Sequence, residues 1–246
     1  TILRLPAPSP LYGEQLQDMA APGFKPEGQI TWQTINSSHT DAGGDEYELQ
    51  RRQFSVDNTA VSASARLAPA LIGMGLLDNI SDADILANSD PDDKNRDGIS
   101  GRANIRSSTQ DGTMRIGRFG WKASQSSLHE QIALAFHQDM GISSSLHLPE
   151  NCIGDNCQAY STANTDLEIS DKLLNAVTDY IANLAVPAAE HDAQSQQGFK
   201  IFEQLACAAC HTPRFQTRLP SIQLVSTDSA KKSNTATRHT ETIFPF

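Results

Sequence analysis

The sequence predicts a mainly α-helical fold with much irregular structure and only a few short strands. Two segments in the C-terminal half, residues 166–185 and 194–206, carry apolar side chains at helical spacing. The chain also contains 15 Gly and 12 Pro but only 6% aromatic residues, a composition that favours turns. The apolar positions are Leu173, Leu174, Val177, Ile181 and Leu184 in the first segment, and Phe199, Phe202 and Leu205 in the second.

Shorter elements are predicted upstream of these two helices. Short strands are expected around Ile30–Ile35 and Tyr47–Gln53, and a weak helix around Glu14–Met19. The apolar stretch at residues 64–80 predicts a further helix, and residues 82–88 predict another before a break in the pattern. The N-terminal quarter is otherwise expected to be irregular, because it is rich in proline and polar residues.

Two glycines, Gly73 and Gly75, interrupt the apolar stretch. Glycine weakens an isolated helix, so this pair indicates the close approach of another backbone or of a flat ligand. Further along, Ser127 and Glu130 have the spacing of a capping box. A helix is therefore expected to follow Ser127 and to end at Gly141.

The most informative motif is Cys207-Ala208-Ala209-Cys210-His211, the attachment signature of a c-type haem. Each thiol can add across a haem vinyl group, and the adjacent imidazole becomes the proximal iron ligand. The helix predicted at 194–206 leads directly into the motif, as in a cytochrome c-like haem domain. Two alternatives remain: a dithiol redox pair that precedes a histidine, and half of a zinc site, which needs a further cluster of ligands.

The chain is expected to have three parts. Residues 1–60 form an irregular N-terminal segment, residues 61–190 a helical domain with an Asp-rich loop, and residues 191–246 the start of a truncated C-terminal cytochrome c-like haem domain. The chain opens without Met or a signal sequence, which predicts a mature protein or an excised fragment. Since haem is attached covalently outside the cytoplasm, a periplasmic or otherwise extracytoplasmic location is expected. Cys152 and Cys157 are then available for a local disulfide.

The charge balance excludes one class of partner. The chain has 29 acidic and 19 basic residues, a net charge of −10, so no basic footprint for a nucleic acid is expected. An acidic surface fits solubility, or a cationic redox partner. No run of about 18 apolar residues occurs, and no membrane span is expected.

The Asp-rich loop resembles the first half of an EF-hand calcium loop. Asp93, Asn95 and Asp97 provide oxygen side chains at alternate positions before a turn glycine, and Ile99 can offer its carbonyl. The position of the usual bidentate Glu is taken by Asn104. The loop is therefore a candidate calcium site, with an Asp- and Gly-rich surface turn as the alternative.

Five other side chains are candidates for roles near a haem. Met140 and Met74 are candidates for the distal iron ligand, although a buried methionine more commonly serves packing. Trp121 is a candidate electron relay, with core packing as its alternative. His129 and His137 share the helix after Ser127, where surface or satisfied histidines are the expected interpretation.

With these residues in place, the chain resembles the bacterial di-haem oxidoreductase family of peroxidase type, also labelled thiol-oxidoreductase-like. That family is distantly related to di-haem cytochrome c peroxidases. The resemblance covers most of the chain, and its motifs occur in the same order. They are Leu11-Tyr12-Gly13, Arg66–Pro69 with Ile72–Leu77, Asp97–Arg102, Gly117–Ala123, Asp139-Met140-Gly141, Leu184–Pro187 and Cys207–His211.

The resemblance implies a haem oxidoreductase whose partner is a redox protein or a small oxidant such as peroxide. The family carries an earlier Cys-x-x-Cys-His and continues beyond residue 246, so the chain is expected to be a fragment with one of two haem sites. In related peroxidases the C-terminal haem is the electron relay, which implies that role for the Cys207–His211 site. The alternatives are an electron-transfer module without catalysis of its own and a thiol–disulfide oxidoreductase that uses Cys207 and Cys210.

Overall fold

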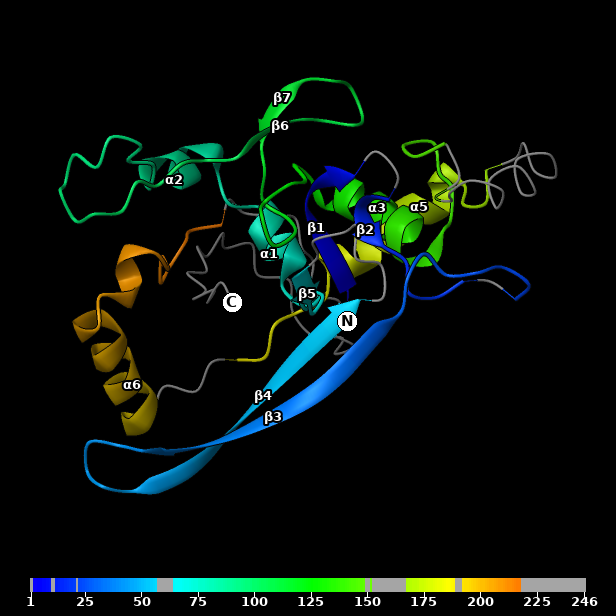
Figure 1. The fold of residues 1–246 in the computed structure, drawn as a ribbon. Helices are drawn as coiled ribbons and strands as arrows, with labels where there is room; N and C mark the ends of the chain where they lie inside the picture. The colour runs from blue at the N-terminus through cyan, green and yellow to red at the C-terminus, as the bar shows by residue number, and fades with distance from the viewer. Residues whose placement is uncertain are drawn as a thin grey trace, which may run out of the picture. The chain divides into compact units, whose positions relative to one another are not determined.

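The computed structural model describes residues 2–9, 12–20, 22–56, 64–148, 151, 167–188 and 192–217 (Figure 1). Contacts divide the chain into two compact units. The first comprises Thr1–Ala68, Phe136–Ser143 and His147–Glu168, and the second comprises Pro69–Ala135, Ser144–Leu146 and Ile169–Phe246. The domain boundaries expected near residues 60 and 190 stay predictions, because a contact division does not show which parts fold independently.

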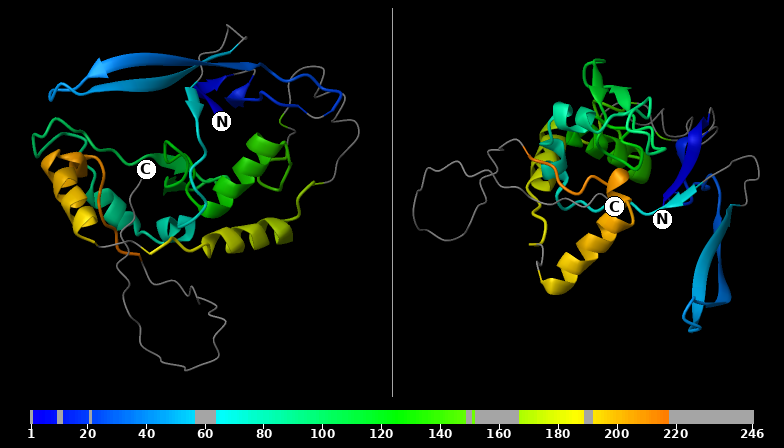
Figure 2. Two further views of the ribbon diagram at one scale, coloured as in Figure 1. Left: turned by 90° about the horizontal axis from the view of Figure 1, so that it is seen from below. Right: turned by 90° about the vertical axis from the view of Figure 1, so that its left-hand side faces the viewer.

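The first unit contains two small antiparallel sheets. In one of them β1 (Ile2–Ser9) lies between β2 (Gly13–Leu16) and β5 (Ser64–Arg66). The other is a ribbon of only two strands, β3 (Ile30–Thr40) and β4 (Glu46–Val56), which pair along their whole length (Figure 2). The turn between them is closed by Asp41, whose Oδ1 accepts hydrogen bonds from the backbone N–H groups of Gly43 and Asp45 at 2.8 and 3.0 Å.

The prediction of a mainly α-helical fold is wrong. The described part of the chain contains five α-helices and seven strands, so the fold is a mixture of helices and small sheets. The strands expected around Ile30–Ile35 and Tyr47–Gln53 each extend to 11 residues, and the weak helix expected at Glu14–Met19 is replaced by β2. Strand pairing decides these segments, because cross-strand partners outweigh the weak intrinsic preference of a short polar segment.

The second unit has a core built mainly from three helices and a short hairpin. The helices are α1 (Met74–Asp78), α3 (Leu128–Met140), whose last residues belong to the first unit, and α5 (Asp171–Ala182). The hairpin pairs β6 (Ile105–Ser107) with β7 (Met114–Ile116). The buried apolar side chains of the second unit are Ile80, Ile116, Phe119, Leu128, Ile132, Ala133, Leu134, Ile169, Leu174 and Ile181.

Most predicted helices are confirmed, with shifted ends. The apolar segment at 166–185 forms α5, and Ser170 caps its N-terminus by accepting from the backbone N–H of Leu173. The short helix α2 (Asp82–Ala87) begins in the same way after Ser81. The segment at 194–206 forms α6 (Ala193–Gln204). By contrast α1 is only five residues long, because Gly73 before it adopts φ +75°.

Gly75 shows which of the two expectations for the glycine pair is correct. A Cβ at this position would lie 2.0 Å from the backbone carbonyl oxygen of Ala182, near the end of α5. The backbone N–H of Gly73 also donates to the carbonyl of Leu184 at 3.0 Å. The close approach is therefore that of another backbone, as one of the two interpretations of the sequence predicts, and it fixes α1 against α5.

Candidate functional site

The Cys-x-x-Cys-His motif forms a tight turn directly after α6. Leu205 ends the helix, Ala206 turns the chain with φ +57°, and η1 (Cys207–Ala209) follows as a 3-10 turn. The carbonyl of Cys207 then accepts hydrogen bonds from the backbone N–H groups of Cys210 at 3.2 Å and His211 at 2.9 Å. A single turn therefore holds both thiols and the imidazole, because one carbonyl organises all three residues.

The helix that leads into this turn has an apolar side that the core formed by the described residues does not cover. None of the residues of α6 is buried. Ile201 and Leu205 are 45% and 70% exposed, whereas Phe199 and Phe202 are half-buried and stack with ring centroids 6.2 Å apart. Apolar side chains that face water beside a reactive motif mark a surface where an apolar ligand or another segment can bind.

The turn is not a zinc site among the residues that the structure describes. No group of three or more His, Cys, Asp or Glu side chains in this part of the chain could hold a metal ion, so Cys207, Cys210 and His211 do not converge as ligands of one cation. Both cysteines are free thiols, Cys207 half-buried and Cys210 exposed.

The Asp-rich loop stabilises itself through its own side chains. The carboxylate of Asp93 accepts from the backbone N–H of Gly98 at 3.2 Å, and Asp97 accepts from that of Ile99 at 2.8 Å. The side chain of Asn95 makes two bonds with Asp97: its amide oxygen accepts from the Asp97 N–H, and its NH₂ group donates to the Asp97 carboxylate. These bonds are those of a polar surface turn, and within the described ranges no metal-binding group forms there, so calcium stays a prediction.

The other predicted candidates lie in separate places. Met140 is 63% exposed at the end of α3, in the first unit, whereas Met74 starts α1 in the second. Trp121 is 51% exposed, so core packing does not explain it. The ligand and relay roles stay predictions. The disulfide predicted between Cys152 and Cys157 lies outside the described residues.

A buried carboxylate organises the second unit. Glu130 is only 1% exposed, and its Oε1 accepts from the Ser108 hydroxyl at 2.7 Å and from the N–H and hydroxyl of Thr109 at 2.6 and 3.1 Å. Its Oε2 accepts from the N–H and hydroxyl of Ser126. As a capping box requires, the hydroxyl of Ser127 accepts from the backbone N–H of Glu130. The Glu130 carboxylate, however, accepts from the backbone N–H of Ser126 instead of that of Ser127. Glu130 thus connects α3 to the end of the β6–β7 hairpin.

This network controls the ionisation of Glu130. Burial raises the pKa, but the hydrogen bonds from Ser126, Ser108 and Thr109 outweigh it and lower the pKa to about 2 from the ordinary 4.5. The carboxylate is therefore ionised at neutral pH and has no proton to give. A structural role follows, and a role as an acid in peroxide chemistry does not.

The lowered pKa predicts an acid-sensitive fold. The folded state binds the Glu130 proton more weakly than the unfolded state does. The contribution of the ionised Glu130 carboxylate to the free energy of unfolding is therefore complete above pH about 4.5 and is lost as the pH falls toward about 2. We expect the difference in urea midpoint between the wild type and Glu130→Gln to shrink over that interval. Far-ultraviolet circular dichroism at a series of pH values measures it, and a constant difference would contradict the assignment.

The histidines of α3 have partners in keeping with the expectation for them. His129 Nδ1 lies 3.1 Å from the hydroxyl of Thr178 on α5. His137 stacks on His147 with ring centroids 5.1 Å apart. His147 was not singled out in the sequence, because it lies in a non-periodic turn with no motif around it. The stack is a packing contact in the first unit.

The turn after α6 brings two free thiols and a histidine together in five consecutive residues. Residues 34–246 match the family described as "Di-haem oxidoreductase, putative peroxidase". The chain belongs to this family, and the predicted resemblance is confirmed. The family description supports an oxidoreductase function with haem as the prosthetic group. No curated protein and no solved structure matches the chain, and no helix in its described ranges is long and apolar enough to cross a membrane.

Proposed function

We propose that the chain is a periplasmic c-type haem oxidoreductase of the peroxidase type, and that Cys207, Cys210 and His211 hold its haem. The thiols of Cys207 and Cys210 would form thioether bonds to the porphyrin, and His211 would bind the iron as the proximal ligand. When bound, the haem supplies one-electron redox chemistry, with a redox protein or peroxide as the exchange partner.

One observation carries this proposal: a single turn holds two free thiols and an imidazole beside uncovered apolar side chains. The backbone N–H of His211 donates to the Cys207 carbonyl, which holds the histidine in the same turn as both cysteines. Ile201 and Leu205 offer apolar surface for a flat porphyrin, since neither side chain is buried in the core of the described residues.

The attachment residues can be tested by haem content. We expect the wild type, expressed with a periplasmic haem-attachment system, to retain one haem after denaturation, as measured by a pyridine haemochrome spectrum. The double variant Cys207→Ala/Cys210→Ala loses all covalent haem, because no thiol remains to form a thioether.

The matched control is the other cysteine pair. Cys152→Ala/Cys157→Ala removes the same number of thiols and is expected to keep the full haem content. A colourless wild type, in a host that matures a reference cytochrome normally, would contradict the proposal. Thiol–disulfide exchange activity in that colourless protein would favour the dithiol alternative.

A further inference from the structure

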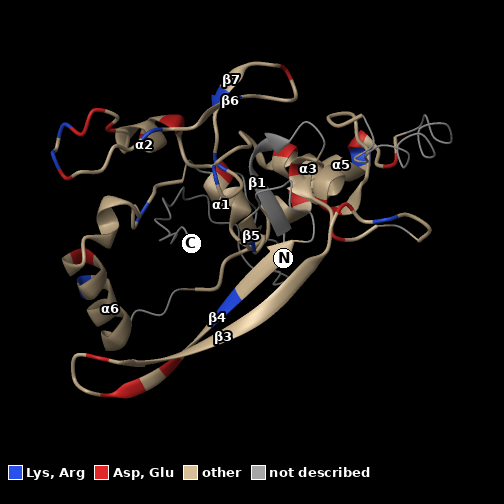
Figure 3. Cartoon of the chain, viewed as in Figure 1, with Lys and Arg blue, Asp and Glu red and all other residues tan. Residues whose placement is uncertain are grey.

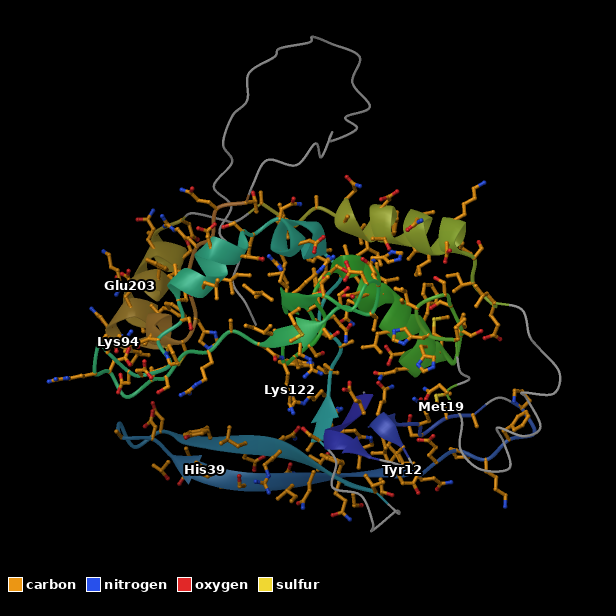
Figure 4. The ribbon with its side chains drawn as sticks, turned by 90° about the horizontal axis from the view of Figure 1, so that it is seen from above. Tyr12, Met19, His39, Lys94, Lys122 and Glu203 are labelled. Atoms are coloured by element: carbon orange, nitrogen blue, oxygen red, sulfur yellow. The ribbon has the colours of Figure 1, made fainter. Side chains whose placement is uncertain are left out.

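The β3–β4 ribbon has exposed side chains on both faces and, within the described residues, two long edges that pair with no further strand. In that part of the chain the two strands pair with each other alone, and nearly all of their side chains are exposed. His39, labelled in Figure 4, stacks on Tyr47 across the ribbon, and Trp32 packs on Phe54 near the other end. A two-stranded ribbon is marginally stable alone in water, so a partner for its edge would stabilise it.

All charged side chains of the ribbon lie on β4, where the acidic residues come before the basic ones. Glu46 and Glu48 lie at the start of β4, and Arg51 and Arg52 lie in its middle, seen as red and blue parts of the strand in Figure 3. Strand β3 contains no Asp, Glu, Lys or Arg, so these charges face neutral partners such as Ser38 and Thr34. Among the described residues none of the four makes an ion pair.

This order is complementary to itself when the strand is reversed. We propose that the edge of β4 pairs antiparallel with β4 of a second copy of this chain, around a two-fold axis at Gln50. In that register Glu48 lies opposite the partner's Arg52, and Arg52 lies opposite the partner's Glu48, so two ion pairs form by symmetry. Leu49, which is 49% exposed, lies opposite the long side chain of the partner's Arg51.

The pairing turns two ribbons into one sheet with the order β3–β4–β4–β3. Four strands form a sheet of ordinary size, and the backbone N–H and C=O groups along both β4 edges gain partners. Registers shifted by one or two residues pair Glu48 with Arg51, or Glu46 with Arg52, instead. Charge therefore favours a second copy of β4 in the antiparallel direction, and the proposed axis at Gln50 is the register that pairs Glu48 with Arg52.

Charge exchange tests the register without altering the fold, because the residues are exposed and face neutral neighbours. We expect sedimentation velocity over a concentration series to detect a dimer of the wild type. Arg52→Glu places two acids opposite each other twice per dimer and weakens association about tenfold or more. The double variant Glu48→Arg/Arg52→Glu restores the pairs and the dimer. A monomeric wild type, or an Arg52→Glu variant that dimerises normally, overturns the proposal.

A cysteine placed on the two-fold axis gives an independent test. Directly opposite residues of an antiparallel pair have Cα atoms about 4.5–5.5 Å apart, which a disulfide can bridge. Gln50→Cys is therefore expected to form a covalent dimer on mild oxidation. Gln53→Cys is the matched control on the same strand, because its two copies lie roughly 20 Å apart in this register. Equal cross-linking of both variants, or of neither, contradicts the register at Gln50.

Discussion

Gly75→Ala is expected to destabilise the second unit by about 3 kcal/mol. The added Cβ would lie 2.0 Å from the Ala182 carbonyl oxygen, which is backbone of α5 and has no flexible end to move aside. Either α1 moves away from α5 or the end of α5 unwinds, and both changes expose apolar core. Urea unfolding followed by far-ultraviolet circular dichroism measures the loss as a lowered midpoint.

Gly198→Ala is the matched control for that substitution. Gly198 lies within α6, and a Cβ there meets nothing within 4 Å. The same chemical change is therefore expected to be neutral or to stabilise the helix by about 0.5–1 kcal/mol. If Gly75→Ala and Gly198→Ala shift the midpoint alike, the contact between α1 and α5 does not have the geometry described.

Glu130→Gln is expected to cost about 3 kcal/mol at pH 7. The Glu130 carboxylate accepts five hydrogen bonds, and each of its two oxygens accepts one from a backbone N–H, Oε1 from Thr109 and Oε2 from Ser126. Whichever way the glutamine amide is turned, its NH₂ group therefore faces one of these backbone N–H groups. That buried backbone N–H loses the oxygen that accepts its hydrogen bond. The urea midpoint at pH 7 reports the loss, because the network connects α3 to the β6–β7 hairpin.

The control for this variant is Glu203→Gln on α6. Glu203, labelled in Figure 4, is exposed and accepts no hydrogen bond from the buried network. Removal of its charge is expected to change the unfolding free energy by less than about 0.5 kcal/mol. A loss at Glu130 no larger than the loss at Glu203 would mean that the network contributes nothing to stability.

The helices could be predicted from the sequence because their evidence is local. The apolar positions of α5 recur every three or four residues, and Ser170 sits where a cap is needed. Gly75 also revealed a close approach, since glycine inside an apolar stretch needs a packing reason. The motif at Cys207–His211 could be recognised for the same reason, because all its residues lie within five positions.

The strands of the ribbon could be predicted only in part, around Ile30–Ile35 and Tyr47–Gln53, and the three-stranded sheet and the buried network could not be predicted. Their partners are distant in sequence. β1 pairs with β5, about sixty residues further along, and no local pattern in β1 specifies that partner. The full length of the ribbon was missed because polar residues such as Ser37 and Ser38 continue β3 beyond the predicted strand, and side chains on both faces are exposed. Glu130 looked like a local cap, yet Ser108 and Thr109 are 22 and 21 residues away.

The central claim is that Cys207 and Cys210 hold one haem covalently. Its most direct test is the intact mass of the purified chain under denaturing conditions, followed by a peptide map. We predict a mass increased by one haem, with the addition on the peptide that contains Cys207–His211. An unmodified mass, with both thiols free or joined to each other after expression beside a working haem-attachment system, would contradict the account.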